Sequence, residues 1–189
     1  MTPDRVLSLI PPDAKKVGLV GAAISDSQTS ASAQLRRDIL KGTVERHLLR
    51  TGEIAGGLGL MSYKVDMRVW LPNETEADID ELIQFTLELR KVTGRTRVAL
   101  GIAPFVAKRN TPLDRAPYAG IKAVNRSLKR LTRGLRGKVE VRPTSVCWAW
   151  VEYVVAQGTR EAGLAILDAL HEGATFADYK RAFVAHGIA

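Results

Sequence analysis

The stretch KVDMRVWLPNETEADIDELIQFTLELRKV (Lys64–Val92) decides the fold, because a strand pattern gives way to a helix pattern within it. Apolar and charged residues alternate over Lys64–Leu71, which predicts a half-buried strand. Over Glu76–Val92 the apolar residues keep helical spacing and the first turn is acidic, which predicts a helix. The apolar run RVALGIA (Arg97–Ala103) follows and predicts another strand. Strands that alternate with helices predict a parallel sheet covered by helices.

The same alternation continues on both sides of this stretch. A buried strand is expected at Val17–Ala23 and a further strand at Lys138–Pro143. Helices are expected at Asp4–Ile10, Ala33–Ile54, Gly120–Arg136, Ser145–Gln157, Arg160–Glu172 and Phe176–His186. The fold class is therefore α/β, with a parallel sheet of about four strands, covering helices and a C-terminal helical segment.

Length and composition indicate one domain. The chain has 189 residues, 46% of them hydrophobic, which is enough for one sizeable core. We expect a single domain over 1–189, with strand and helix units in 1–143 and C-terminal helices in 144–189. No apolar segment approaches the roughly 20 residues of a membrane-spanning helix, and the first residues do not form a signal peptide. One cysteine favours a reducing compartment, so we expect a cytoplasmic protein without a membrane partner.

Positive charge is concentrated in one part of the chain. The net charge is +8, and Lys108–Arg142 alone holds eleven basic and two acidic residues. The basic residues of the predicted helix lie opposite its apolar face: Lys122, Arg126, Lys129, Arg130, Arg133 and Arg136. Such a stripe can follow phosphates and bind a nucleic acid or another anionic partner. No aromatic residue lies among these charges to stack bases, and the alternative is a solvated helix face.

Four segments resemble one enzyme superfamily. They are VGLVGAAISD (Val17–Asp26), LPNETEADIDEL (Leu71–Leu82), GIAPFVAKRNTPL (Gly101–Leu113) and VRPTSVCWAWVEY (Val141–Tyr153). They resemble the barrel core and C-terminal part of radical S-adenosylmethionine proteins, in the group often fused to a cobalamin-binding domain. The resemblance implies a partial TIM-like barrel. It also implies a [4Fe–4S] cluster on a CxxxCxxC loop, which cleaves S-adenosylmethionine and starts radical chemistry.

The chain departs from that pattern at its cysteines and in its length. Cys147 is the one cysteine, whereas such a cluster needs several thiolates, so we expect no cofactor on this chain alone. At least one barrel unit is also missing after Asp26 by comparison with relatives. We therefore expect either an incomplete parallel barrel or an open sheet, in a truncated or degenerate copy without catalysis of its own. An exposed sheet edge favours a homodimer in which a second copy supplies the missing strands.

Two loops carry the site residues that the resemblance implies. Relatives have the motif GLPTET, whose backbone contacts the adenine of S-adenosylmethionine, where this chain has Trp70–Thr75. The cofactor candidates carried over are Leu71, Pro72 and Glu74. The alternative is an ordinary strand-to-helix turn with a good cap. In the loop PFVAKRNTPL, an anionic substrate or a cofactor carboxylate would be bound by Lys108, Arg109 and Asn110; the alternative is a solvated basic tip.

The remaining chemically reactive residues indicate no further site. His47, His171 and His186 lie far apart and lack the spacing of metal ligands. Cys147 is expected to be a small buried hydrophobe. The neighbouring aromatic residues Trp148, Trp150 and Tyr153 are expected mostly in the core. Three functions stay open: a decayed radical enzyme, a binding module for anions or nucleic acids, and a structural protein that oligomerises.

Overall fold

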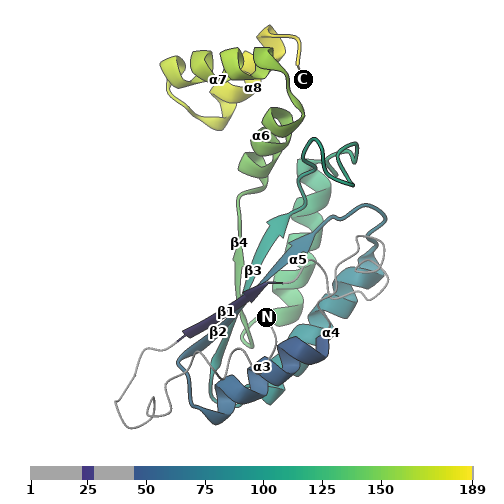
Figure 1. Cartoon of the computed structure of the whole chain (residues 1–189), viewed down its shortest axis with the longest axis vertical. Helices are drawn as coiled ribbons and strands as arrows, with labels where there is room; N and C mark the ends of the chain where they lie inside the picture. Colours follow the sequence, from purple (N-terminus) through teal and green to yellow (C-terminus); the bar gives the residue numbers. More distant parts are fainter. Residues whose placement is uncertain (1–22, 28–44, 189) are drawn as a thin grey trace.

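The structure is a computed structural model that describes residues 23–27 and 45–188. Its elements, in chain order, are β1 (Ala23–Ser27), α3 (Glu45–Gly57), β2 (Ser62–Val69), α4 (Glu76–Val92), β3 (Arg97–Pro104), α5 (Ile121–Leu135), β4 (Glu140–Pro143), α6 (Val146–Gln157), α7 (Arg160–Glu172) and α8 (Phe176–Ala185). Figure 1 shows the sheet with α3, α4 and α5 in one part, and α6, α7 and α8 beyond the ends of the strands.

The described strands form one parallel sheet in the order β1-β2-β3-β4, so each strand pairs with its neighbour in the sequence. The register places Lys64 of β2 beside Ala99 of β3, and Ala99 beside Glu140 of β4. The first and last strands do not pair with each other, so the sheet is open with β1 and β4 at its edges. This confirms the expected α/β fold with an open parallel sheet.

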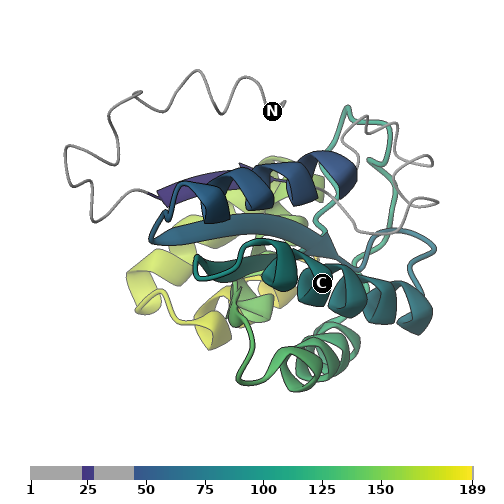
Figure 2. The same cartoon turned by 90° about the horizontal axis from the view of Figure 1, so that it is seen from below.

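One face of the sheet forms the main core with α3, α4 and α5. Val65 and Met67 of β2 and Leu100 of β3 lie on this face and are buried against the helices. The three helices follow one another across the sheet, as Figure 2 shows from below. Because successive strands are neighbours and every connection carries a helix, the helices cover a single face.

The helix boundaries follow the sequence pattern closely. The predictions for α4 and α7 are confirmed at both ends, those for α6 and α8 differ by one residue at one end, and that for α5 differs by one residue at each end. Thr75 begins α4 with a capping box, in which its side chain accepts from the Asp78 N–H and the Asp78 carboxylate accepts from the Thr75 N–H. Such reciprocal bonds fix the first residue of a helix.

The first strand differs from its prediction. β1 begins at Ala23, the last residue of the predicted strand, and continues through residues assigned to a polar loop. Its extent is set by backbone pairing with Ser62–Asp66 rather than by the apolar run. The rest of that predicted strand, the helix Asp4–Ile10 and the first part of the helix Ala33–Ile54 lie outside the described residues.

The C-terminal helices have a hydrophobic cluster of their own. Val151 and Val154 of α6, Ala165 of α7 and Phe183 of α8 form its buried centre. Trp150 meets Phe183 edge to face, with ring centroids 5.8 Å apart. Within the described part of the chain, no helix is long and apolar enough to cross a membrane.

Candidate functional site

The turn after β2 holds the residues predicted to contact a cofactor. Trp70 and Asn73 have φ angles of 64° and 66°, in the left-handed region that favours glycine. The Trp70 N–H donates to the Glu74 carboxylate, and the Glu74 N–H donates to the Leu71 carbonyl at 3.0 Å. The Trp70 and Glu74 N–H groups and the Leu71 carbonyl are therefore hydrogen-bonded within the turn itself.

Glu74 follows the C-terminal end of the parallel strand β2, and the pKa of its carboxyl group is close to neutral pH. Burial raises its pKa to about 7; the hydrogen bond from the Trp70 N–H opposes this shift, and the nearby Asp78 carboxylate adds to it. Sites in parallel α/β folds form at this end of the strands. A carboxyl group with such a pKa can take up and release a proton at neutral pH. Leu71 is buried in the core and Pro72 is half-buried, so Glu74 is the one member of the predicted set with a titratable side chain.

The indole of Trp70 packs against the main core. Its Nε1 is buried and has no hydrogen-bond partner in the described part of the chain. The side chain therefore fills space beside the turn, where a glycine would leave it open.

The predicted basic loop after β3 is partly neutralised. Lys108 forms a salt bridge with Glu152 of α6, with Nζ and Oε1 2.9 Å apart. Arg109 and Asn110 are exposed at the tip of the loop. Lys108 thus links the loop after β3 to α6, and all three predicted residues lie at the surface.

The basic stripe on α5 divides into two parts. Arg130 donates to Asp80 at 2.7 and 2.6 Å and to Glu76 at 3.0 Å, which joins α5 to α4. These bonds lower the pKa of Asp80 and raise that of Arg130. The residues of the stripe that stay exposed without such a pair in the described residues are Lys122, Arg126, Lys129 and Arg133 of α5 and Arg136 just after it. The anion-binding prediction therefore applies to these five and is weakened for Arg130.

A hollow of about 650 Å³ lies at the N-terminal end of α5. It is lined by Pro117, Tyr118, Ala119, Gly120, Ile121, Lys122, Ala123, Arg126, Trp150, Tyr153, Phe176 and Lys180. Two residues of the predicted stripe, Lys122 and Arg126, therefore line the same hollow as aromatic side chains from the C-terminal helices. No aromatic residue lies among these charges along the chain, whereas the fold brings Trp150, Tyr153 and Phe176 to the same hollow.

The aromatic residues of α6 are less buried than predicted. Trp148 is 46% exposed and packs edge to face on Tyr179, with centroids 5.3 Å apart. Trp150 and Tyr153 are half-buried and line the hollow. The prediction of a core position depended on the helix side that Trp148 and Val151 share with Val155. Val151 is buried, but Val155 is 39% exposed, so that side is covered only in part.

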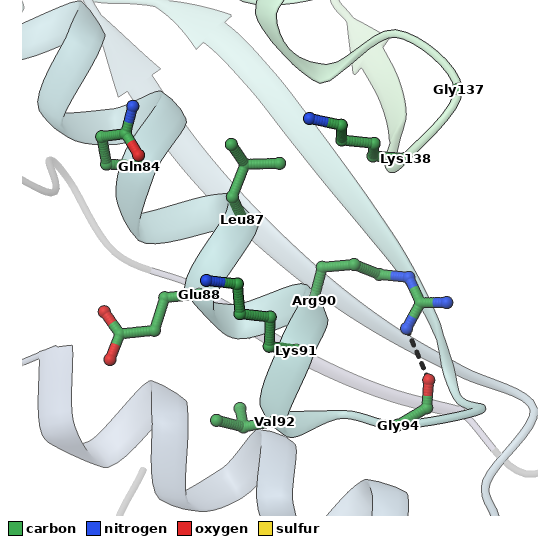
Figure 3. A pocket seen from close by; sticks show the side chains of 9 residues that line it. All are labelled: Gln84, Leu87, Glu88, Arg90, Lys91, Val92, Gly94, Gly137 and Lys138. Atoms are coloured by element: carbon green, nitrogen blue, oxygen red, sulfur yellow. Dashed lines mark hydrogen bonds between the residues drawn. The ribbon is translucent and has the colours of Figure 1, made fainter.

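A second hollow lies at the other end of the strands, near the starts of β3 and β4. Figure 3 shows Lys91 and Arg90 of α4 and, across the opening, Lys138 of the turn before β4. The Arg90 guanidinium turns away to donate to the Gly94 carbonyl at the end of α4. This hollow was not predicted. It lies at the N-terminal end of the strands, whereas parallel α/β folds usually build their sites at the C-terminal end.

The face of the sheet opposite α3, α4 and α5 is polar. Lys64 and Asp66 of β2 form a salt bridge at 2.8 Å, and Glu140 and Arg142 of β4 form another at 2.8 Å. Between them, β3 presents small residues, and a Cβ added at Gly101 would lie 1.9 Å from an Asp66 carboxylate oxygen. No described helix covers this face, although parallel sheets are ordinarily buried on both sides.

Metal-binding chemistry finds no support among the described residues. No group of three His, Cys, Asp or Glu side chains there is arranged to hold a metal ion. Cys147 is half-buried, and His186 lies 2.7 Å from an Asp168 carboxylate oxygen. With one thiol in the whole chain, the donor set does not fit a [4Fe–4S] cluster.

Comparison with known proteins finds a relative of unknown function. The chain is 28% identical over 123 residues to an uncharacterized protein of Methanocaldococcus jannaschii, and the aligned region covers 62% of this chain and 27% of that protein. The chain thus matches about a quarter of the relative's length. No protein family and no solved structure matches the chain significantly.

Proposed function

We propose that this chain is a barrel segment related to the radical S-adenosylmethionine proteins, serving as a scaffold that does not catalyse by itself. Support comes from the sheet, in which consecutive strands are parallel neighbours and the helices lie on one face. This is the arrangement of a segment cut from a (β/α) barrel, whose inner face carries no helices.

The observation that carries the proposal is the backbone of Trp70. In the family motif that the turn resembles, this position is glycine, and here the φ of 64° is one that glycine adopts without steric cost. A bulky residue in this region is an outlier. The turn therefore keeps a glycine conformation although the glycine is absent, which supports descent from a glycine-containing turn.

The residues present do not fit the cofactors of that family. One thiol is fewer ligands than a cluster held by this chain alone would need. The Trp70 N–H and the Leu71 carbonyl, two backbone groups of the turn that resembles the adenine-contacting motif, are already hydrogen-bonded to Glu74. We therefore derive no reaction step through either cofactor.

A second copy would complete the sheet in this proposal. Both edge strands, β1 and β4, are unpaired on their outer sides within the described sheet, and its uncovered face is charged. Two copies of four strands would give the eight strands of a TIM barrel. The polar pairs Lys64–Asp66 and Glu140–Arg142 would then lie inside the closed barrel.

Two measurements test this proposal. Equilibrium dialysis against S-adenosylmethionine should detect no binding to the isolated chain, and stoichiometric binding would contradict the scaffold role. Sedimentation velocity should give a mass near twice the 20.6 kDa of one chain, with dissociation on dilution. A monomer at every concentration would remove the second copy as the source of the missing strands.

A second candidate function is binding of nucleic acid by the exposed residues of α5. It is favoured by the four cations of α5 that remain free of ion pairs in the described residues, Lys122, Arg126, Lys129 and Arg133. Binding should weaken steeply as salt rises. Arg133→Glu should weaken it more than Arg130→Glu, because Arg130 is already bound by Glu76 and Asp80. Equal effects of the two reversals would contradict a role for the exposed stripe.

A further inference from the structure

The hollow at the N-terminal end of α5 is lined by residues from two parts of the fold, α5 with the segment before it and the C-terminal helices. Lys122 and Arg126 come from α5, Tyr118 from the segment before it, and Trp150 and Tyr153 from α6. The Tyr118 hydroxyl donates to the Val146 carbonyl at 3.0 Å, which fixes that ring against the first turn of α6. Burial raises the pKa of Tyr118 to about 12, with a further contribution from the Cys147 thiol, so this donor keeps its proton at neutral pH.

The charge of the hollow is of one sign. Its lining includes the cations Lys122, Arg126 and Lys180 and no carboxylate. All three side chains are exposed, so their charges can meet a ligand without first leaving a buried ion pair. A ligand that fills this hollow is expected to carry negative charge.

The end of the helix adds to this field. Gly120 begins α5 with a φ of 89°, and no side chain in the described structure caps the helix there. The first N–H groups of a helix have no acceptor within it, and its N-terminus carries a partial positive charge. The hollow thus combines this charge with three side-chain cations.

The other part of the lining is aromatic. Tyr118 and Tyr153 lie with their ring centroids 5.6 Å apart, and Trp150 and Phe176 meet at 5.6 Å and 78°. All four rings are half-buried, so each is held by packing and keeps an accessible side. Fixed aromatic surfaces beside cations suit a flat ring that carries an anionic group.

We propose that this hollow binds one nucleotide unit of a single-stranded nucleic acid. The base stacks on the aromatic side chains, and its phosphate lies against Lys122, Arg126 and Lys180. Neighbouring phosphates follow the exposed face of α5 through Lys129 and Arg133, three and seven residues beyond Arg126. The inference rests on the second candidate function and adds to it a base-binding site, which the charged stripe alone does not have. The volume of about 650 Å³ is within the range of pockets that bind small ligands.

The test is a titration of the full chain with a single-stranded RNA of mixed sequence, the duplex of the same sequence, and adenosine monophosphate. Tryptophan fluorescence reports stacking and anisotropy of labelled RNA reports binding. The single strand should quench the emission, and the quenching should disappear in Trp150→Phe but persist in Trp148→Phe. Charge reversal at Lys122 and Arg126 together should weaken binding by about tenfold or more. The matched control Arg130→Gln, on the same helix but turned towards α4, should leave it nearly unchanged. Circular dichroism confirms that each variant is folded.

The outcomes separate the two claims. If the single strand binds in a salt-sensitive way but the Trp150 emission does not change, the result supports phosphate binding by the exposed cations of α5 and contradicts the base site. Equal affinity for duplex and single strand would overturn it as well. Quenching by adenosine monophosphate at concentrations as low as those of RNA would support the base site but assign it to a free nucleotide rather than a strand. If none of the three ligands binds, both the base site and the nucleic-acid function are wrong.

Discussion

Trp70 and Glu74 determine the backbone conformation of the turn after β2. Trp70 occupies a left-handed conformation and Glu74 closes the turn by accepting its N–H. Left-handed backbone is costly for a residue with a side chain, so the surrounding contacts must hold it. Packing of the indole against the core and burial of the carboxyl supply those contacts.

The first prediction compares glycine with alanine at position 70. Trp70→Gly and Trp70→Ala both remove the indole, but only glycine relieves the left-handed backbone. The glycine variant should therefore be more stable than the alanine variant by about 1 kcal/mol. Urea unfolding of both variants measures the difference. An alanine variant as stable as the glycine variant would contradict the assigned conformation.

The second prediction concerns the pH dependence of stability. The pKa of Glu74 is raised from 4.5 to about 7 in the folded chain, so between these values the folded state binds more protons than the unfolded state. The contribution of this group to stability is greatest below about pH 4.5 and falls as pH rises to about 7, by up to about 3 kcal/mol. Glu74→Gln, which keeps an acceptor for the Trp70 N–H, should lose this part of the slope. The free energy of unfolding at pH 5 and pH 8 measures it, and identical slopes in both proteins would contradict it.

The third prediction concerns Gly101 and Asp66 on the polar face of the sheet. A Cβ at position 101 would displace the Asp66 carboxylate from its place beside Lys64. In an Asp66→Ala background, Gly101→Ala should stabilise the strand by about 0.5–1 kcal/mol, because alanine loses less entropy on folding. In the unaltered chain, the stability change caused by Gly101→Ala should be less favourable by at least about 1 kcal/mol, because the Asp66 carboxylate is in the way. A double-mutant cycle measures this coupling, and additive effects would show that the two residues do not meet.

At the scale of elements, the beginnings of the helices test the capping rules within one molecule. Thr75 caps α4 through the capping box with Asp78, whereas Thr159 before α7 makes no side-chain bond to its helix backbone. Thr75→Ala should therefore cost about 1 kcal/mol of unfolding free energy. Thr159→Ala should stay within about 0.5 kcal/mol of the unaltered chain. Thermal unfolding compares the two, and equal losses would be inconsistent with the role of Thr75.

Helices were more predictable than strands for a physical reason. A helix such as α4 or α7 is defined by hydrogen bonds within itself and by caps close in sequence, so its pattern gives both ends. A strand is defined by its neighbour, and β1 extends as far as its pairing with β2 allows. The alternation of β2 was predicted from the sequence, but only the sheet shows that its charged side lies on a face that no described helix covers.

For the whole molecule, the sequence predicted the α/β class and most elements but not the meeting of α5 with the C-terminal helices. Trp150 and Phe176 lie 24 and 50 residues after Arg126, and no local pattern connects them. The ion pairs of Lys108 and Arg130 were equally hidden, because their partners are on other helices. These contacts changed the site from a basic stripe into a hollow with aromatic and cationic walls.

In the proposed role, the α/β scaffold persists in a chain that cannot by itself hold the cluster of radical S-adenosylmethionine proteins. The decisive measurement is anaerobic loading with iron and sulfide, followed by desalting and determination of both elements per chain. We predict far less than one cluster per chain, because the chain holds a single thiol. Four iron and four sulfide atoms retained per chain, with cleavage of S-adenosylmethionine after reduction, would contradict it.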